Sequence, residues 1–330
     1  MGNASLSLAK KEKQDDFYTG YPEIEDELRF YSDMFRGKRV YCNCDNPLES
    51  NFFKYFVNNF EKLGLKKLNC TCFAGDESVN RQLPLFVEKA SSKFILDQTA
   101  WCANITTTKG WGGTDLMGLF NLPGNRLKKL KGNGSYSSSE CVEILDKSDI
   151  VVTNPPFSLF RDFVSLLVKH DKKFLIIGNL NAVATVDIFP LIKNGKIWLG
   201  HTTPKDFTVP NSSEKRMLGF CCWYTNLGTP TIRERVPLTK SYSPAEYSKY
   251  QNYNAIEVSK TADIPMGWDG AMGVPVSFIQ KHNPEQFTIL GCDETCGRGM
   301  SGDLWLGGST EPVVDGVRKY TRIFVKHNTD

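Results

Sequence analysis

The chain has 330 residues, a net charge of +3 and 40% hydrophobic residues, enough for one large domain or two ordinary ones. No apolar run approaches the roughly 18 residues of a membrane helix, and the charge is too small to indicate a polyanionic partner by itself. Residues 1–16 are polar and lack the apolar centre of a signal peptide, so we expect a flexible tail and a cytoplasmic protein.

The ten cysteines predict buried thiols and no metal site. Cys42 and Cys44, like Cys70 and Cys72, are two residues apart in apolar runs, which would place each pair on one face of a strand. No CxxC pair occurs, so a zinc site is not favoured. Reduced cysteines in a reducing compartment explain the pattern best.

Acidic residues follow the first two predicted strands. The strand 40–43 runs into Asp45 and Asn46, before an apolar-periodic helix over 52–63 that Gly64 ends. The strand 68–73 is followed by Asp76. An acidic residue at this place often binds a ribose in nucleoside-binding sheets, so both carboxylates are candidate cofactor ligands. Asp45 also fits an ordinary turn, because its side chain caps backbone groups locally.

A basic cluster lies between residues 126 and 131. Its four cations are Arg126, Lys128, Lys129 and Lys131. Such a run is usually a solvated surface, but beside a nucleic-acid site it also predicts contacts with phosphates. The following turn, 132–136, leads into a helix for which Ser137 and Glu140 form a predicted capping box.

The stretch from Ser148 to Phe157 organises the chain. Ile150 to Val152 reads as a buried strand, and Asn154-Pro155-Pro156-Phe157 ends it because each proline lacks an N–H. An apolar-periodic helix follows over 159–169. A rigid tetrapeptide is therefore expected at the carboxyl end of a parallel strand, where open α/β sheets bind ligands.

The tetrapeptide suits one reaction. An amide oxygen accepts hydrogen bonds and carries no charge that titrates. The Asn154 carbonyl and a proline-fixed backbone carbonyl can together accept both hydrogens of a planar amine, while Phe157 stacks on the ring. This predicts methylation of the exocyclic amine of a base. A bare Asn-Pro-Pro-Phe also fits a proline-rich turn without chemistry.

Alternating strands and helices to about residue 200 predict an α/β fold, a mostly parallel sheet covered by helices on both faces. Beyond residue 200 helical periodicity fades, and short strands and loops rich in Pro, Gly, Tyr and Ser follow. We expect a tail over 1–16, a catalytic and cofactor-binding domain over 17–225, and a smaller target-recognition region over 226–330.

The chain resembles the EcoRI-type adenine-specific DNA methyltransferases over most of its length. The resemblance is carried by Phe17-Tyr18-Thr19, Tyr41 to Asp45, Ser50 to Phe56, Ser148 to Arg161, Asp171 to Ile177, Lys196 to Gly200, Met272 to Val276 and Asn283 to Phe287. It implies methyl transfer from S-adenosylmethionine to N6 of adenine in double-stranded DNA, leaving S-adenosylhomocysteine. It also implies a Rossmann-like seven-stranded sheet and a flipped-out base.

The resemblance also implies roles for individual residues. Asn154, Pro155, Pro156 and Phe157 correspond to the catalytic tetrapeptide. Phe17, Tyr18, Thr19 and Asp45 correspond to cofactor contacts. Ser135 and Tyr136 lie where these enzymes place the cofactor's adenine, but they replace the Asp-Phe of the family pattern, so its carboxylate is missing. The usual Gly-rich cofactor loop is also absent, and residues 45–50 take its place.

Three functions remain open at this point. The favoured one is a DNA adenine methyltransferase, as a monomer or homodimer, with a cognate restriction endonuclease as a candidate partner. Methylation of RNA or of a protein glutamine is an alternative, against which the EcoRI-like segments argue. A non-catalytic DNA-binding protein is another; the intact Asn154 to Phe157 argues against it and Ser135 argues for it.

Overall fold

The computed structural model describes residues 18–47, 49–73, 100–113, 115–208, 215–295 and 297–328. The predicted tail, Phe17 and Asp76 lie outside these residues. The chain forms two compact units, one of residues 1–179 and 200–229, the other of residues 180–199 and 230–330.

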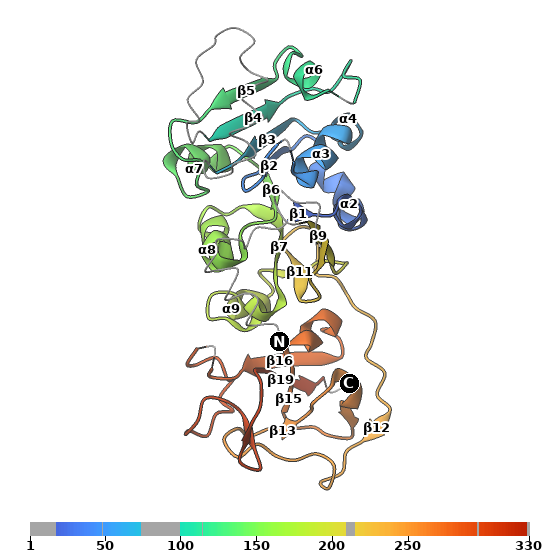
Figure 1. Ribbon diagram of the computed structural model, residues 1–330. Helices are drawn as coiled ribbons and strands as arrows, with labels where there is room; N and C mark the ends of the chain where they lie inside the picture. The colour runs from blue at the N-terminus through green and yellow to red at the C-terminus, as the bar shows by residue number, and fades with distance from the viewer. Residues whose placement is uncertain are drawn as a thin grey trace. The chain divides into compact units, whose positions relative to one another are not determined.

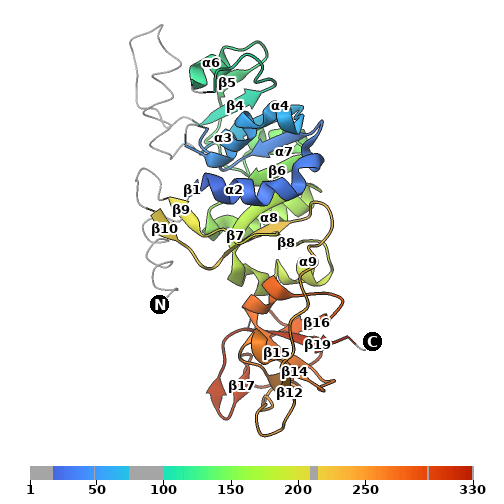
Figure 2. The ribbon, with the colours of Figure 1, turned by 90° about the vertical axis from the view of Figure 1, so that its right-hand side faces the viewer.

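The strands before residue 230 are β1 (Tyr18–Thr19), β2 (Arg39–Cys42), β3 (Lys67–Thr71), β4 (Trp101–Ile105), β5 (Arg126–Lys129), β6 (Ile150–Thr153), β7 (Lys173–Asn179), β8 (Trp198–Leu199), β9 (Asp206–Thr208), β10 (Lys215–Met217) and β11 (Cys221–Thr225). The helices there are α2 (Tyr21–Leu28), η1 (Arg29–Phe35), α3 (Asn51–Asn58), α4 (Phe60–Leu63), α6 (Leu116–Phe120), α7 (Ser139–Asp146), η2 (Phe157–Leu159), α8 (Phe160–Lys169), η3 (Leu180–Ala184) and α9 (Phe189–Lys193). Figures 1 and 2 show their arrangement.

A large mixed sheet organises the first unit, and the strands of this unit follow the order β5-β4-β3-β2-β6-β7-β11. The neighbours β3, β2, β6 and β7 are parallel, while β4, β5 and β11 run antiparallel to their partners. The α/β prediction is confirmed, and β6 is central as expected. The expectation of a mostly parallel sheet holds only for these four strands.

Helices pack on both faces of this sheet, because the strands alternate buried side chains above and below. On one face Val40, Cys42 and Val152 join the apolar residues of α2 and α3 in one core. On the other face the Cys141 thiol of α7 lies 3.9 Å from Thr71 Oγ1, and the Phe160 ring of α8 lies against Gly178. Figure 1 shows α3 and α7 on opposite sides of β2 and β3.

The helix predicted over 52–63 is two helices, α3 and α4. Ser50 caps α3, its Oγ accepting from the N–H groups of Phe52 and Phe53. Asn59 leaves helical geometry between the two helices, and its side-chain amide donates to Tyr55 O at 2.9 Å. Gly64 ends α4 with a φ of +63°, the left-handed conformation that glycine adopts readily.

The predicted capping box of α7 is wrong by one residue. The cap is Ser138, whose Oγ accepts from Cys141 N, and not Ser137. Glu140 instead accepts from the backbone N–H groups of Lys131 and Gly132, at 2.6 and 2.9 Å. Its carboxylate therefore holds the end of the basic cluster and the start of the 132–136 turn.

The part of the chain that the structure describes contains no membrane helix, disulfide or metal cluster. No helix there combines the length and apolar character needed to cross a bilayer. The cysteines in these residues are all free, and all but Cys44 are buried. No group of His, Cys, Asp or Glu suited to a metal ion occurs within the same ranges.

The second unit is built on a four-stranded sheet of order β13-β15-β19-β16. Its elements beyond residue 230 are β12 (Lys240–Ser241), β13 (Ile256–Glu257), η4 (Thr261–Asp263), β14 (Pro265–Met266), β15 (Met272–Pro275), η5 (Val276–Lys281), β16 (Phe287–Cys292), β17 (Val313–Val314), β18 (Val317–Arg318) and β19 (Arg322–His327). Arg322 forms a bidentate pair with Glu257, and both side chains are 8% exposed. Tyr250 also donates to Glu257.

This buried pair makes a prediction about stability. Arg322→Met leaves the Glu257 charge buried without its partner, so the free energy of unfolding in urea should fall by about 3–5 kcal/mol. The matched control is Arg318→Met, which removes an exposed pair to Glu311 (2.8 Å) and should cost less than about 1 kcal/mol. Equal losses for the two variants would show that the buried pair does not hold this unit together.

Candidate active site

The carboxyl ends of β2 and β6 form the edge that the sequence predicted as the ligand site. These strands are parallel neighbours, with Val40 opposite Ile150. Asp45, three residues after β2, and Asn154, directly after β6, therefore share one edge of the sheet. The same edge is where parallel α/β sheets bind ligands.

The Asp45 carboxylate is the hub of this edge. It is 3% exposed, and each oxygen accepts one short bond, Oδ1 from Ser50 Oγ at 2.5 Å and Oδ2 from Thr153 Oγ1 at 2.6 Å. Its backbone N–H donates to Thr71 O and its carbonyl accepts from the Cys70 thiol, both at 3.1 Å. One residue thus ties the ends of β2, β3 and β6 to the start of α3.

Burial determines how Asp45 titrates. Desolvation raises the pKa of the carboxyl to about 6, although the hydrogen bonds from Ser50 and Thr153 act in the opposite direction. The side chain is therefore mostly ionised at neutral pH, where it accepts both hydroxyl bonds. In this geometry it positions neighbouring groups more than it presents a surface to a ligand.

Thr19 brings the predicted cofactor segment to the predicted catalytic residue. The Asn154 amide nitrogen donates to Thr19 Oγ1 at 3.4 Å, a long bond that joins positions 135 residues apart. Asn51, at the start of α3, donates to Thr19 O at 2.7 Å, and β1 pairs with β9. Tyr18, beside it on β1, is half-buried. Figure 2 shows β1 beside α2 and β9.

The tetrapeptide itself is a bend between β6 and α8. Pro155 is buried, whereas Asn154, Pro156 and Phe157 are half-buried. Phe157 packs at the margin of the main apolar core and begins the short helix η2, in which Leu159 N donates to Pro156 O. The bend is thus held in place, and Asn154, Pro156 and Phe157 remain partly accessible at the edge of the sheet.

Asn43 is a residue of this edge that the sequence analysis did not single out. It directly follows β2 and is 2% exposed, and neither atom of its side-chain amide has a hydrogen-bond partner among the described residues. Buried amides are nearly always hydrogen-bonded, so an amide like this one is typical of a site that a polar ligand completes. The sequence signal that could have identified Asn43 is its place within Tyr41 to Asp45, a segment that carries part of the family resemblance.

Ser135 and Tyr136 reach the same edge from the loop before α7. Gly134 has a φ of +72°, and any Cβ there would collide with Cys72 O, so the loop lies directly against the end of β3. Burial, followed by the charges of Asp162 and Cys44, raises the pKa of Tyr136, and its ring packs edge-on against Phe163 of α8. Ser135 makes only local hydrogen bonds in the described residues, with Asn133, Ser137 and Ser138.

The four predicted DNA-binding cations do not form one surface. They lie on or after β5, an edge strand, whose side chains alternate between the two faces. Lys128 lines a hollow on one face, whereas the Lys129 ammonium lies 5.5 Å from the Trp101 ring centroid on the other. Arg126 shares the face of Lys128, and Lys131 follows the strand.

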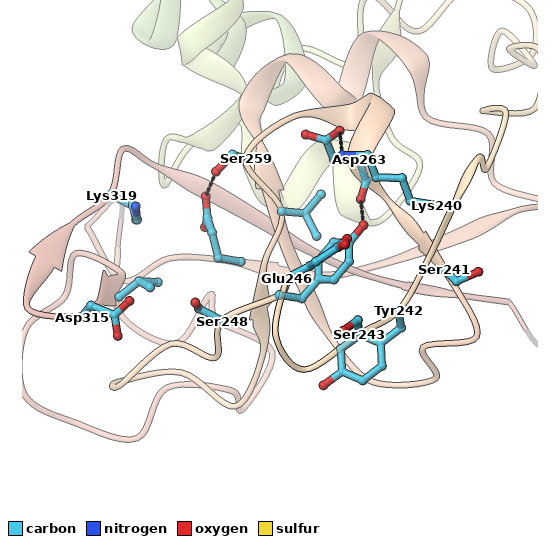
Figure 3. Close-up of a pocket in the computed structure, with 14 residues that line it drawn as sticks. Lys240, Ser241, Tyr242, Ser243, Glu246, Ser248, Ser259, Asp263, Asp315 and Lys319 are labelled. Atoms are coloured by element: carbon cyan, nitrogen blue, oxygen red, sulfur yellow. Dashed lines mark hydrogen bonds and ion pairs between the residues drawn. The ribbon is translucent and has the colours of Figure 1, made fainter.

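The second unit contains a larger hollow of about 930 Å³ that the sequence did not predict. Hydroxyl side chains line it together with two lysines and four carboxyl groups: Ser241, Ser243, Ser248, Ser259, Tyr242, Tyr247, Lys240, Lys319, Glu246, Glu257, Asp263 and Asp315. Lys240 pairs with Asp263 at 2.8 Å, as Figure 3 shows, and Ser259 Oγ donates to Glu257 Oε1. The carboxyl groups in this hollow outnumber the lysines, so the hollow is poorly suited to binding the phosphates of a DNA backbone.

Comparison with known proteins gives the family. The family model described as adenine-specific methyltransferase EcoRI matches residues 5–328. The chain belongs to this family. Type II methyltransferase M.EcoRI of Escherichia coli is 39% identical over 315 residues, which cover 87% of this chain and 89% of the relative.

Two further relatives of the EcoRI-type family come from mycoplasmas. Type II methyltransferase M.MgeORF184P of Mycoplasma genitalium is 35% identical over 307 residues, 87% of this chain and 86% of the relative. Type II methyltransferase M.MpnI of Mycoplasma pneumoniae is 35% identical over 309 residues, 87% of this chain and 85% of the relative. No solved structure matches the chain.

The Asp45 carboxyl predicts a pH dependence of stability. It titrates at about 6 when folded, against an ordinary value of 3.8. Between these values the folded state binds more protons than the unfolded state, so the free energy of unfolding falls as pH rises. This contribution declines by about 2–3 kcal/mol between about pH 4 and pH 7.

Asp45→Asn removes the titrating group, so the comparison of wild type with this variant isolates the effect. Urea unfolding at several pH values should show the wild-type stability, relative to the variant, decreasing as pH rises through 4 to 7. A difference that stays constant over this range would mean that Asp45 titrates at its ordinary value.

Proposed function

We propose that this protein transfers a methyl group from S-adenosylmethionine to the N6 amine of adenine in double-stranded DNA, with the base extruded into a pocket at Asn154 to Phe157. The observation that carries the proposal is the contact between Thr19 and Asn154 at one edge of the sheet. It joins the segment expected to bind the cofactor to the amide expected to hold the base. Family membership supports the same reaction.

The residues at this edge suit the cofactor. The unpaired Asn43 amide offers both a donor and an acceptor to polar groups of the methyl donor. Tyr18 and Tyr136 provide aromatic surface, and Asp45 acts as a positioning residue between them. The four parallel strands, with their ligands at the carboxyl edge, favour a Rossmann-like domain over residues 17–225.

Asn154 and Pro155 would orient the amine. The lone pair of the N6 nitrogen is delocalised into the adenine ring, so the amine is a poor nucleophile. The hydrogen bond to Thr19 directs the Asn154 amide nitrogen toward β1. The amide oxygen Oδ1 is then the atom that accepts one hydrogen of the adenine amine. The Pro155 carbonyl accepts the other, which favours a pyramidal nitrogen whose lone pair points at the reacting carbon.

S-adenosylmethionine supplies an activated methyl group on a sulfonium, so no covalent enzyme intermediate is needed. The nitrogen–carbon bond forms as the sulfur–carbon bond breaks, and the product amine then loses one proton to water. Stacking on Phe157 holds the extruded ring, a contact of about 1–3 kcal/mol per base. No cysteine takes part.

The other unit supports a proposal about target choice. Residues 226–330 would recognise the DNA sequence, and the hollow around Tyr242 and Lys240 presents hydroxyl, ammonium and carboxylate groups, the types that read base edges. We further propose action in the cytoplasm as a monomer or homodimer, alongside a restriction endonuclease of the same specificity. Contacts of Arg126, Lys128, Lys129 and Lys131 with DNA remain a proposal.

Removal of the Asn154 amide tests the mechanism. Asn154→Ala should lower kcat for DNA methylation about 100-fold or more, because it removes an interaction that forms in the transition state. Cofactor binding by calorimetry should change little. Asn59→Ala is the matched control, because it removes another asparagine that makes a single bond of 2.9 Å, away from the site. Wild-type turnover by Asn154→Ala would refute the mechanism.

Phe157 tests the capture of the base. Phe157→Ala should raise KM for DNA and lower kcat, because the extruded ring loses its stacking partner. Phe157→Trp keeps an aromatic surface and should be milder in both parameters. Steady-state kinetics on one duplex substrate gives the comparison, and equal effects of Ala and Trp would exclude stacking as the role of this ring.

A further inference from the structure

The hollow that Lys128 lines belongs to the first unit and lies away from the candidate active site. Its volume is about 370 Å³. It is lined by Arg39, Lys67, Asn69, Cys102, Asn104, Lys128, Ile144 and Lys147. Four of these eight side chains are cationic and two are amides. Most small-molecule pockets are lined by apolar side chains, so this composition indicates a polar, anionic ligand.

Strand register explains why these side chains converge. Arg39 of β2 is opposite Lys67 of β3, two residues before Asn69 on the same face. Asn69 is opposite Asn104 of β4, and Cys102 is opposite Lys128 of β5. The end of α7 closes the hollow with Lys147, whose carbonyl accepts from Arg39 Nη1 at 2.9 Å.

The floor of the hollow is polar and nearly buried. Asn69 is 5% exposed, and its side-chain amide makes no hydrogen bond within the described residues. Asn104 Nδ2 contacts Cys102 Sγ at 2.9 Å. An amide that lines a concave site in this way can donate to the oxygens of a ligand.

The charge around this floor is strongly positive. Arg39 is balanced by Asp149, whose carboxylate accepts from Arg39 N at 2.7 Å and lies 4.0 Å from its Nε. Lys67, Lys128 and Lys147 have no acidic partner in the described residues. Burial raises the pKa of the Cys102 thiol to about 11, while the Lys128 and Lys67 ammonium groups, which line the same hollow, oppose the rise.

The hollow is distinct from the candidate active site. Arg39 and Lys67 are the first residues of their strands, whereas Asp45 and Asn154 follow the last residues of β2 and β6. At about 3.3 Å per residue the two edges of the sheet are roughly 10–15 Å apart. A ligand at the Arg39 and Lys67 end of the hollow is therefore neither the methyl donor nor the extruded base. The hollow extends from there to Cys102 and Lys128, which are level with Thr71 at the end of β3.

We propose that this hollow is a binding site for a phosphate compound with two or more negative charges. Three ammonium groups that pair with no acidic side chain of the described residues compensate the charge, and the Asn69 amide donates to an oxygen from the floor. Such phosphates have two sources, a free pyrophosphate-like compound or the backbone of DNA outside the target site. Only the second source depends on the proposed function.

Calorimetry with inorganic pyrophosphate tests the first source. The test variant is Lys67→Gln, Lys128→Gln, Lys147→Gln, and the charge-matched control is Lys62→Gln, Lys66→Gln, Lys169→Gln, three exposed lysines of the same unit. Wild type and control should bind alike, and the test variant should bind at least 10-fold more weakly. If the test variant fails to fold, Asn69→Asp, which places a negative charge on the floor, should cause the same loss.

Salt dependence tests the second source. Binding of a labelled duplex is followed by fluorescence anisotropy over a range of salt concentrations. If backbone phosphates occupy the hollow, the slope of log K against log salt should become shallower in the test variant, by about 0.9 for each phosphate that the removed lysines neutralise. The control variant should keep the wild-type slope.

The two measurements separate the outcomes. Weaker pyrophosphate binding with an unchanged salt slope identifies a free phosphate compound, and a shallower slope identifies DNA. If the test variant matches the control in both, there is no phosphate site in this hollow. A wild-type protein that methylates no DNA would overturn the proposed function, but the pyrophosphate titration would still decide the role of the hollow.

Discussion

The buried Asp45 carboxylate is the constraint on which the candidate site depends. Its two oxygens accept from Ser50 and Thr153, so it fixes both the first turn of α3 and the last residue of β6. Asn154 follows Thr153 directly, and Asn51 of the same helix turn holds Thr19. Both sides of the proposed site, the cofactor side and the base side, are therefore positioned through one carboxylate.

A second buried carboxylate connects the segments around β1 in the same way. Glu27 on α2 is fully buried, and it accepts from the backbone N–H groups of His201 and Thr202, at 2.8 and 2.6 Å. It also accepts from Tyr31 OH at 3.0 Å. Because β9 follows this segment and pairs with β1, Glu27 helps to place Thr19. Buried acids with complete hydrogen bonding thus hold together segments that are far apart in the sequence.

Local patterns predicted the elements that local physics controls. The apolar run before Asn154 predicted β6, the prolines predicted its end, and Gly64 predicted the end of α4. The directions of β4 and β5 were not predictable, because alternation indicates a strand and not its partner. The basic cluster was interpreted as one surface because β5 was not recognised, and alternation along that strand separates Lys128 from Lys129. The Asn43 amide lacks a hydrogen-bond partner among the described residues because of the way distant segments pack around it, and no local sequence pattern predicts such packing.

The reaction proposed for this chain is methylation of adenine at N6 in DNA. The most direct measurement incubates the protein with DNA and S-adenosylmethionine carrying a labelled methyl group, followed by digestion to nucleosides and chromatography. The label should appear in N6-methyldeoxyadenosine and in no other nucleoside. Label in a cytosine product, or transfer to RNA or protein while DNA stays unlabelled, would contradict it.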